Sequence, residues 1–379
     1  MLLSADPLWE LTAACGRDTR PGRLDLIVGV YRDDSGASPI MRAVRAAESR
    51  LARSSTTKAY VGPSGDHRFL ASISELILDD PSVRARATAV QTVAGTGALR
   101  LLAELIAATG PDRTVHLGVP AYVNHQGVLR AAGLRVDTHP VADMLAAASV
   151  ARPGDVLMIQ GCCHNPTGYQ MPASDWDALA EVLYRRGVVP FIDQAYFGLG
   201  DGLEADLDGM RRLLRVVPEA YVAVSGSKAW GLYSERVGAA LVIGTSPARD
   251  RALLEGAARV SYSQPPAHGA ALVAEILTDP SLRSCWRDEL ESMRLRLGRL
   301  RSGLALRLSD LPGFAGLSTQ RGMFLTLPLS PEAMESLRVD HGVYGLPTGR
   351  INLAGLPSPR VPEVAAAIRA VAQPSVPAP

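Results

Sequence analysis

The sequence predicts an α/β protein with a largely parallel sheet. Strand-like apolar runs occupy residues 156–159, 188–192, 221–224 and 239–243. A segment with helical spacing, 175–186, separates two of these runs, and parallel strands need such crossover helices. The length of 379 residues and the apolar content of 47% allow two or three domains with a large core.

The C-terminal third of the chain predicts a long helical segment and a tail. Residues 281–308 carry apolar side chains at helical spacing and contain no proline, which predicts one or two long helices of the kind that joins two domains. The proline-rich stretch after Ala372 is expected to be disordered.

Charge and composition favour small-molecule partners. The formal net charge is +1 and the basic residues are scattered, so neither a nucleic-acid nor a membrane-surface binder is expected. No apolar run approaches the ~18 residues of a membrane span, and the N-terminus has no basic region of a signal peptide, which predicts a cytosolic protein. The four cysteines, Cys15, Cys162, Cys163 and Cys285, form no CxxC motif, so neither a disulfide nor a metal site is expected.

Gly95, Thr96 and Gly97 follow an apolar run and precede a helical pattern. Free backbone N–H groups at such a helix start make an anion site suited to a phosphate, although a plain tight turn has the same sequence pattern. A dinucleotide fingerprint is disfavoured, because Arg100 stands at its third glycine position.

Two further segments place polar side chains where predicted strands end. Asn165, in the turn Asn-Pro-Thr-Gly, follows the strand at 156–159 and precedes a helix expected to be capped near Ser174. Asp193 ends the apolar run 188–192, and Tyr196 follows three residues later. A buried carboxylate needs a cation or a donor opposite it, so Asp193 either binds a ligand or caps a helix.

Lysine occurs only at Lys58 and Lys228 among 39 basic residues. Lys228 lies just beyond the predicted strand 221–224, and unlike arginine it can lose its proton and act as an amine nucleophile. Ser225, Ser227 and Arg236 beside it can hold a phosphate dianion, and the lysine can form a Schiff base with an aldehyde. A phosphate, an aldehyde and a ring nitrogen paired with Asp193 together describe pyridoxal phosphate.

At these residues the chain resembles the fold-type I pyridoxal-phosphate aminotransferases, in the class that includes aspartate and aromatic amino-acid aminotransferases. Segments in the family's order span some 330 residues. They are "DLIVGVYRDDSG", "TTKAYVGPSG", "AGTGALR", "NHQGVLRAAGL", "CCHNPTG", "FIDQAYFGLG", "SGSKAWGLYSERVG", "YSQPPAHGA", "QRGMF" and "GVYGLPTGRINLAGL".

The resemblance implies a role for each matching residue. Lys228 is similar to the Schiff-base lysine that also moves the substrate proton, Asp193 to the partner of the ring nitrogen, and Asn165 and Tyr196 to the donors to the ring oxygen. The residues similar to the family's phosphate cradle are Gly95, Thr96, Ser225, Ser227 and Arg236.

The resemblance also implies substrate contacts and a dimer. Arg350 matches the arginine that binds the substrate α-carboxylate, and Gly29 matches a glycine near the substrate, where Asn165 is also expected. Tyr60 matches a tyrosine that reaches the phosphate of the neighbouring subunit, which implies a homodimer with shared active sites. Arg259 aligns with the arginine that binds a distal carboxylate from the other subunit, which favours aspartate or glutamate as one substrate without excluding aromatic ones.

Three residues depart from the family pattern. Tyr122 stands where the family usually has a tryptophan stacked on the cofactor, so it is the expected cofactor and substrate contact at this position. Ala94 replaces a usual serine, and Gln160 replaces a histidine in the groups behind Asp193.

The resulting prediction is a cytosolic homodimeric aminotransferase with ping-pong kinetics. A large cofactor domain of residues 39–292 would hold a mixed, mainly parallel seven-stranded sheet, and a small α/β domain would combine 1–38 with 293–379, of which 372–379 would be a disordered tail. One alternative is a specialised elimination, replacement, decarboxylation or C–C bond reaction on the same scaffold, and another is a non-catalytic binding protein. A third is a serine acyl-enzyme, because the spacing from Ser225 to Lys228 matches its SxxK motif, but the Lys-Thr-Gly motif that accompanies SxxK in such enzymes is absent from the sequence.

Overall fold

The computed structural model describes residues 7–372, which form two compact units. The larger unit comprises Ile40–Cys162 and Met171–Glu291, and the smaller one comprises the described residues of Met1–Pro39, Cys163–Gln170 and Ser292–Pro379. This division differs from the expected one by a single residue at each outer boundary, and it places Cys163–Gln170 with the termini. The reason is local hydrogen bonding, since the Arg321 N–H donates to the Gly168 carbonyl at 2.6 Å.

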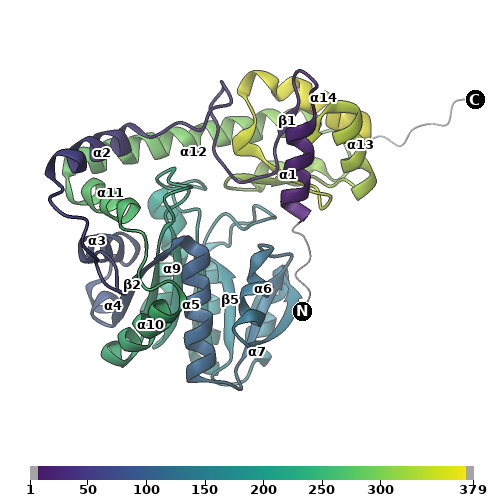
Figure 1. Cartoon of the computed structure of the whole chain (residues 1–379). Coiled ribbons are helices and arrows are strands. Elements are labelled where there is room, and N and C mark those ends of the chain that lie inside the picture. The colour runs from purple at the N-terminus through teal and green to yellow at the C-terminus, as the bar shows by residue number, and fades with distance from the viewer. Residues whose placement is uncertain (1–6, 373–379) are drawn as a thin grey trace, which may run out of the picture. The chain divides into compact units, whose positions relative to one another are not determined.

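The larger unit contains the seven-stranded sheet, with strand order β2-β8-β7-β6-β5-β3-β4 (Figure 1). The strands β3, β4, β5, β6 and β7 run parallel to one another, whereas β8 runs antiparallel to both of its neighbours, β2 and β7. The predicted α/β fold with a mixed, mainly parallel sheet is therefore confirmed. The strand bounds are β2 (Ala87–Val93), β3 (Thr114–Val119), β4 (Arg135–Pro140), β5 (Val156–Gln160), β6 (Val189–Gln194), β7 (Ala220–Ser225) and β8 (Val237–Ile243).

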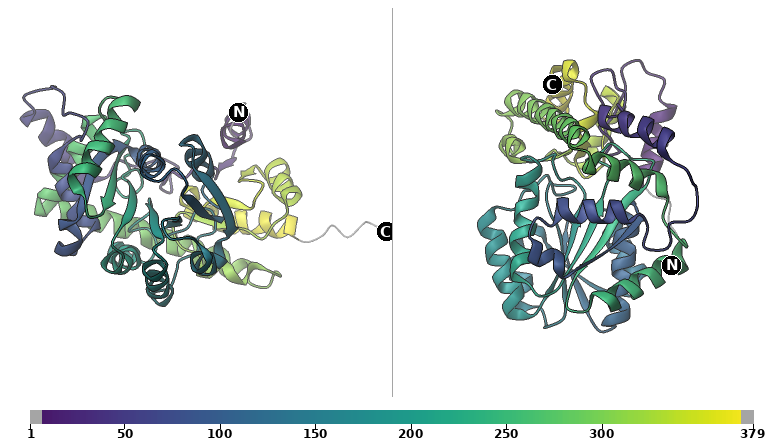
Figure 2. Two further views of the ribbon diagram at one scale, coloured as in Figure 1. Left: turned by 90° about the horizontal axis from the view of Figure 1, so that it is seen from below. Right: turned by 90° about the vertical axis from the view of Figure 1, so that its left-hand side faces the viewer.

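Helices cover both faces of this sheet, and Figure 2 shows its strands between them. On one face α5 packs on β7 and β8, with α6 and α10 beside it. The other face carries α7, α8 and α9, and α3 and α11 pack near β2 and β8. The helix bounds are α2 (Arg42–Ser54), α3 (His67–Ile77), α4 (Pro81–Ala85), α5 (Ala94–Thr109), α6 (Asn124–Ala131), α7 (Met144–Val150), α8 (Ala173–Arg186), α9 (Leu203–Val216), α10 (Pro247–Ser261) and α11 (Ala267–Thr278).

The core of the larger unit explains these elements. Strands β6, β7 and β8 are buried along their whole length, as apolar strands covered on both faces are. The apolar stripe of α5, which includes Leu101, Leu102 and Ile106, packs on Val90 and Phe191 of the sheet. Burial of these side chains holds the carboxyl ends of the parallel strands in fixed positions.

One expectation about the helices is confirmed and another is wrong. Residues 281–308 form a single helix, α12 (Pro280–Leu308), which contributes residues to both units. Helix α8 begins at Ala173 with Pro172 as its N-cap, whereas a cap near Ser174 was expected. The Ser174 hydroxyl instead donates to the Asp175 carboxylate at 3.1 Å, so it does not cap the helix.

The smaller unit packs its helices around its own apolar core. Leu300, Leu304 and Leu308 of α12 are buried in this unit with Leu325 and Ile351. Strand β1 pairs in parallel with β10, and β9 pairs antiparallel with β11. The other bounds are α1 (Pro7–Arg17), β1 (Leu24–Asp25), β9 (Phe324–Thr326), α13 (Pro331–His341), β10 (Val343–Tyr344), β11 (Arg350–Asn352) and α14 (Val361–Ala372).

Two sequence-based expectations concern the chain ends and membranes. The proposed disordered tail was placed at residues 372–379, but Ala372 is the last residue of α14, and 373–379 lie outside the described residues. Among the described residues, no helix is long and apolar enough to span a membrane.

Candidate active site

Lys228 follows β7 in a turn that aromatic packing fixes. The indole of Trp286 on α12 donates from Nε1 to the Ala229 carbonyl at 2.7 Å. Trp286 also stacks on Trp230 at 5.1 Å between ring centroids, and the Trp230 ring meets Phe197 edge-on. The residues next to Lys228 are therefore held by a buried aromatic cluster.

The amine of Lys228 is surrounded by protein, although part of the side chain is exposed. Its pKa is lowered from 10.5 to about 8, chiefly by desolvation; the negative charge of Asp193 opposes this shift and the positive charge of Arg236 adds to it. Its Nζ lies 5.1 Å from the centroid of the Tyr196 ring, close enough for a cation–π contact. A substantial fraction of Lys228 is therefore neutral near pH 8.

Asp193 is buried at the end of β6, and His125 is its partner. The carboxylate oxygen Oδ2 lies 2.8 Å from His125 Nε2. His125 is in the first turn of α6, so the β3–α6 connection carries the imidazole to the end of β6. The alternative that Asp193 caps a helix does not apply, since Asp193 lies within a strand and precedes no helix start.

Tyr122 lies beside the pair formed by the Asp193 carboxylate and the His125 imidazole. Its ring meets the His125 ring edge-on at 5.3 Å, and its hydroxyl accepts a hydrogen bond from Asn124 Nδ2 at 3.1 Å. Burial and the charge of Asp193 raise the pKa of the Tyr122 phenol, while hydrogen bonding to Thr96 and Asn124 opposes that rise. The phenol is thus neutral and its hydroxyl is tied to the start of α5.

The start of α5, the end of β7 and the start of β8 approach one another closely. A Cβ added at Gly95 would lie 2.8 Å from the Ser225 Cβ, so only glycine allows this approach. The Ala94 N–H donates to the Arg236 carbonyl at 2.9 Å, and both residues have positive φ, near 55°. Such backbone strain concentrates at functional sites.

Polar groups suited to an anion lie where these three elements meet. The first turn of α5 has free backbone N–H groups, and Ser225 and Ser227 are buried beside it. The Arg236 guanidinium is oriented by a hydrogen bond from Nη1 to the Tyr233 carbonyl at 2.7 Å. Two hydroxyls, a helix start and a guanidinium are a donor set that suits a phosphate dianion.

The smaller unit holds the predicted carboxylate-binding arginine. Arg350 is buried in β11, and its Nη2 donates to the Ile27 carbonyl at 2.7 Å. Its Nη1 donates to Asn165 Oδ1 at 3.2 Å, and its guanidinium lies over the Phe324 ring at 4.5 Å. A Cβ added at Gly29 would lie 2.6 Å from Phe324 Cζ, so Gly29 makes room for the ring beneath the arginine.

Asn165 is positioned by the turn that carries it. The Gly168 N–H donates to the His164 carbonyl at 2.6 Å, and Thr326 Oγ1 donates to the Pro166 carbonyl at 2.7 Å. Since the Arg350 guanidinium donates to Oδ1 of Asn165, the amide Nδ2 is directed away from it as a donor.

Tyr60 and Arg259 lie on the surface of the larger unit. The Tyr60 side chain is 90% exposed, and the N–H groups of Val61 and Gly62 donate to Gln264 Oε1 at 3.0 and 3.1 Å. Arg259 is exposed, and its Nη1 donates to the Ser263 hydroxyl. Within residues 7–372, neither side chain hydrogen-bonds to the groups around Lys228.

The structure therefore groups the predicted residues into three sets. In the larger unit, Lys228 and Tyr196 lie near Asp193, and the anion cradle lies at the neighbouring strand ends. In the smaller unit, Arg350 contacts Asn165, and both lie in the neighbourhood of Phe324 and Gly29. Tyr60 and Arg259 form an exposed set.

Sequence reasoning missed several supporting residues. Asn124 and Phe324 carry no motif signal, because their roles depend on contacts between elements distant in the sequence. The resemblance leaves His125 among the groups behind Asp193, and the structure shows the direct contact of its Nε2 with that carboxylate.

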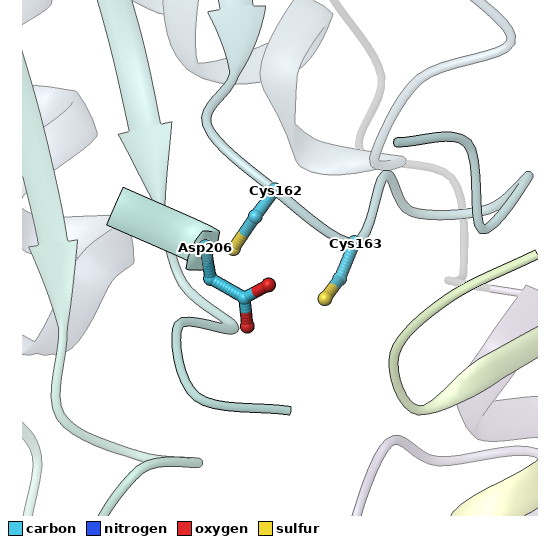
Figure 3. Close-up of side chains that lie close together, drawn as sticks. All are labelled: Cys162, Cys163 and Asp206. Carbon is cyan, nitrogen blue, oxygen red and sulfur yellow. The ribbon is translucent and has the colours of Figure 1, made fainter. Parts of the chain in front are cut away.

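A cluster of candidate metal ligands lies near this region. Figure 3 shows Asp206 of α9 beside Cys162, which follows β5, with Cys163 next in the chain. Gln194 Nε2 lies 3.8 Å from Cys162 Sγ, so the thiol side of the cluster packs on an amide. Both carboxylate oxygens of Asp206 accept backbone N–H bonds, so the carboxylate already has its hydrogen-bond partners.

The donor set around Lys228 fits pyridoxal phosphate. Gly95 leaves a cradle that a Cβ would obstruct, lined with phosphate donors. Lys228 offers an amine with a lowered pKa for the aldehyde, and the buried Asp193 offers a carboxylate for a protonated ring nitrogen.

Comparison with known proteins agrees with this fit. The sequence profile of the family described as aminotransferase class I and II matches residues 21–368. The chain belongs to this family. It is a transaminase that uses pyridoxal phosphate, and the elimination, decarboxylation and C–C bond alternatives are not favoured.

Individual relatives match along nearly the whole chain. The tyrosine aminotransferase of Rhizobium meliloti (strain 1021) is 46% identical over 95% of this chain and 96% of its own length. The aspartate aminotransferase of Escherichia coli (strain K12) is 37% identical over 97% of this chain and 98% of its own length. A solved aromatic-amino-acid aminotransferase from Burkholderia pseudomallei, covalently bound to pyridoxal phosphate, superposes with a TM-score of 0.94, at 36% identity and 98% coverage of each chain.

Proposed function

We propose that Lys228 binds the cofactor and moves the proton of the substrate α-carbon. The observation that carries this is the lowered pKa of its amine, about 8, beside Asp193 and Tyr196. A general base works best when its pKa lies near the working pH, and a neutral amine can accept a proton. Bound pyridoxal phosphate supplies an electron sink for the α-carbon and a temporary carrier for the amino group.

The neighbouring residues set the charge around that chemistry. Asp193, held by His125 Nε2 at 2.8 Å, offers its carboxylate to a protonated ring nitrogen. The Tyr196 hydroxyl and the Asn165 amide donate to the ring oxygen, and Tyr122 contacts the ring. The cradle of Gly95, Thr96, Ser225, Ser227 and Arg236 holds the phosphate, as its donor set supports.

Arg350 binds the α-carboxylate of the amino acid. The Ile27 carbonyl and Asn165 Oδ1 fix its guanidinium, and Phe324 supports its face, so little rotamer freedom is lost on binding. Gly29 keeps the backbone close to the ring of Phe324 and leaves space near the substrate.

The substrates we propose are aromatic amino acids together with aspartate or glutamate. The names of the relatives support both classes, since one is a tyrosine and another an aspartate aminotransferase. Arg259 offers an exposed cation for a distal carboxylate. Its hydrogen bond to Ser263 is exposed to solvent, so the side chain can exchange partners when an uncharged aromatic side chain binds instead.

We propose a homodimer in which Tyr60 and Arg259 serve the partner's active site. The large side chain of Tyr60 is 90% exposed, on a loop that two backbone N–H bonds to the Gln264 side chain hold in place. Val260, which follows Arg259 in the sequence, is 88% exposed. A fixed loop with exposed apolar groups is typical of an interface. The cytosolic location stays a prediction from the sequence.

A single-turnover experiment tests the substrate proposal. Purified enzyme loaded with pyridoxal phosphate receives aspartate, glutamate, phenylalanine, tyrosine or tryptophan separately, with no 2-oxo acid. We expect the cofactor absorbance to change to that of pyridoxamine phosphate with donors of both classes, and a 2-oxo acid to reverse it, as ping-pong kinetics require. Conversion by only one class would refute the dual specificity.

Two variants test Arg259 and the shared sites. Arg259→Ala should raise KM for aspartate and glutamate at least tenfold and leave KM for phenylalanine within about twofold, because only the dicarboxylates lose a charge-assisted contact of about 1.5–3 kcal/mol. Mixing Tyr60→Ala with Lys228→Ala subunits should restore activity, since one site of each mixed dimer has both residues intact. Mixed dimers without activity would contradict the shared sites.

A further inference from the structure

The loop after β6 is closed by one buried carboxylate. Asp206, in the first turns of α9, is 1% exposed. Its Oδ2 accepts the N–H groups of Gly198 and Gly200, each at 2.8 Å, and its Oδ1 accepts that of Asp201 at 2.9 Å. Three backbone donors within four residues converge on this carboxylate, so the loop is an anion-binding turn whose anion is part of the same chain.

The same residue is linked back to the strand that precedes the loop. Gln194, the last residue of β6, donates from Nε2 to the Asp206 carbonyl at 3.2 Å. A Cβ added at Gly161 would lie 1.7 Å from Gln194 Oε1, so the glycine that follows the neighbouring strand β5 makes room for this side chain. Asp206 therefore contacts both ends of the loop, through its carbonyl and through its carboxylate.

Tyr196 lies inside the loop that Asp206 closes. Its carbonyl accepts the Leu199 N–H at 3.1 Å, and its side chain is buried against the Lys228 amine. Gly198, two residues later, has φ near +85°, and a Cβ there would lie 2.4 Å from Leu290 Cδ2, so the turn has little room to adopt another path.

Holding this carboxylate costs free energy. Burial raises the pKa of Asp206 to about 6, and the three backbone hydrogen bonds only partly offset the desolvation. Asn would fill the same volume without a buried charge, but its amide nitrogen cannot accept a hydrogen bond, so at least one loop N–H would lose its partner. The loop therefore requires a residue at position 206 whose two side-chain oxygens both accept hydrogen bonds.

We propose that Asp206 is a positioning residue that fixes the loop 196–201 and thereby sets where the Tyr196 hydroxyl donates to the bound cofactor. This inference rests on the proposed role of Tyr196. Asp206 touches neither cofactor nor substrate in this role and acts only through the loop. A purely structural carboxylate would stabilise the fold but leave the environment of the cofactor ring unchanged, and this difference makes the proposal testable.

The experiment is a double-mutant cycle on the cofactor-loaded enzyme. The variants are Tyr196→Phe, Asp206→Asn, their combination, and Asp208→Asn as a control, because Asp208 lies on the same helix in a surface ion pair with Arg212. The primary readout is the pH midpoint of the absorbance change of the bound cofactor. A hydrogen bond to the charged ring oxygen stabilises its deprotonated form, so Tyr196→Phe should raise this midpoint by roughly one unit.

The inference predicts non-additive effects. Asp206→Asn should raise the pH midpoint by part of the rise seen in Tyr196→Phe. The double variant should have the same midpoint as Tyr196→Phe alone, and Asp208→Asn should have the midpoint of the wild type. An unchanged midpoint in Asp206→Asn, or effects that add fully, would overturn the inference and leave the proposed function intact. An unchanged midpoint in Tyr196→Phe would overturn the role of Tyr196 and the inference with it.

A milder variant covers failure to fold. If Asp206→Asn yields no folded enzyme, Asp206→Glu is used in the same cycle, because it keeps the charge and acceptors but displaces them by one methylene. It should shift the midpoint in the same direction and give no further shift when combined with Tyr196→Phe. An unshifted midpoint in folded Asp206→Glu would count against the inference.

Discussion

Replacing Lys228 with methionine should abolish transamination and stabilise the cofactor-free enzyme near neutral pH. Methionine fills a similar volume without a charge, and the structure places the lysine where desolvation lowers its pKa from 10.5 to about 8. The folded state therefore disfavours the protonated amine that is present at pH 7. Removing the amine removes the free-energy cost of burying its positive charge.

The size of the effect follows from the pKa shift. At about 1.4 kcal/mol per pH unit, the shift corresponds to about 3 kcal/mol as an upper value. Part of the side chain meets solvent, which screens the charge, and the cation–π contact with Tyr196 at 5.1 Å, worth ~1 kcal/mol, is lost. The expected net gain at pH 7 is about 1–2 kcal/mol.

The pH dependence gives a second signature. Between pH 8 and 10.5 the unfolded chain binds more protons at Lys228 than the folded chain, so the free energy of unfolding of the wild type should rise with pH in that window. The Lys228→Met variant lacks this contribution. Its stability advantage should therefore shrink as the pH rises through 8 and vanish near 10.5.

The assay is urea unfolding of the cofactor-free wild type and variant at pH 7, 8, 9 and 10, at one protein concentration because a dimer's stability depends on it. Other groups that titrate in this range contribute equally to both proteins and cancel in the difference. A variant less stable than the wild type at pH 7, or a difference that does not change with pH, would refute the reasoning.

Three further predictions concern the cofactor and the substrate. Gly95→Ala should weaken pyridoxal phosphate binding at least tenfold by fluorescence titration, because its Cβ would lie 2.8 Å from that of Ser225. Tyr122→Phe should weaken it about 2- to 10-fold, since the hydroxyl loses its bond to Asn124, worth ~0.5–1.5 kcal/mol. Arg350→Lys should raise KM for every amino acid donor at least tenfold in steady-state assays, because lysine cannot bind a carboxylate through two parallel bonds.

Matched controls separate these effects from general damage. Gly127→Ala adds a Cβ that meets nothing within 4 Å, so it should leave cofactor affinity unchanged. Tyr184→Phe removes a hydroxyl from an exposed ring, and Arg369→Lys alters a surface ion pair with Asp310, so both should behave as the wild type. If a control variant loses as much cofactor affinity, or raises KM as much, as the variant it is matched with, the assigned contact loses its support.

Local sequence signals located several strands of the fold correctly and singled out residues of the proposed site. Apolar runs mark β5 to β8 within two residues, because buried strands covered on both faces read as continuous apolar segments. The Gly95-Thr96-Gly97 turn predicted an anion site at a helix start, and the structure adds that a Cβ at Gly95 would lie 2.8 Å from the Ser225 Cβ. The scarcity of lysine singled out Lys228.

The tertiary structure decided which of these parts meet. Strand order and direction depend on contacts between distant segments, so the insertion of antiparallel β8 between β2 and β7, which brings Arg236 to Ala94, has no local signature. The assignment of Cys163–Gln170 to the smaller unit likewise follows from hydrogen bonds to residues about 150 positions away.

What the sequence by itself determined is the family and the cofactor, and it singled out Lys228 as the proposed reactive lysine, because these depend on residue types in short motifs and on the order of those motifs along the chain. Only the tertiary structure decided that His125 holds Asp193 and that Asp206 closes the loop of Tyr196. Both contacts join side chains to groups on other elements, and their strength comes from burial. Burial is a property of the packed molecule, and no local pattern of residues specifies it.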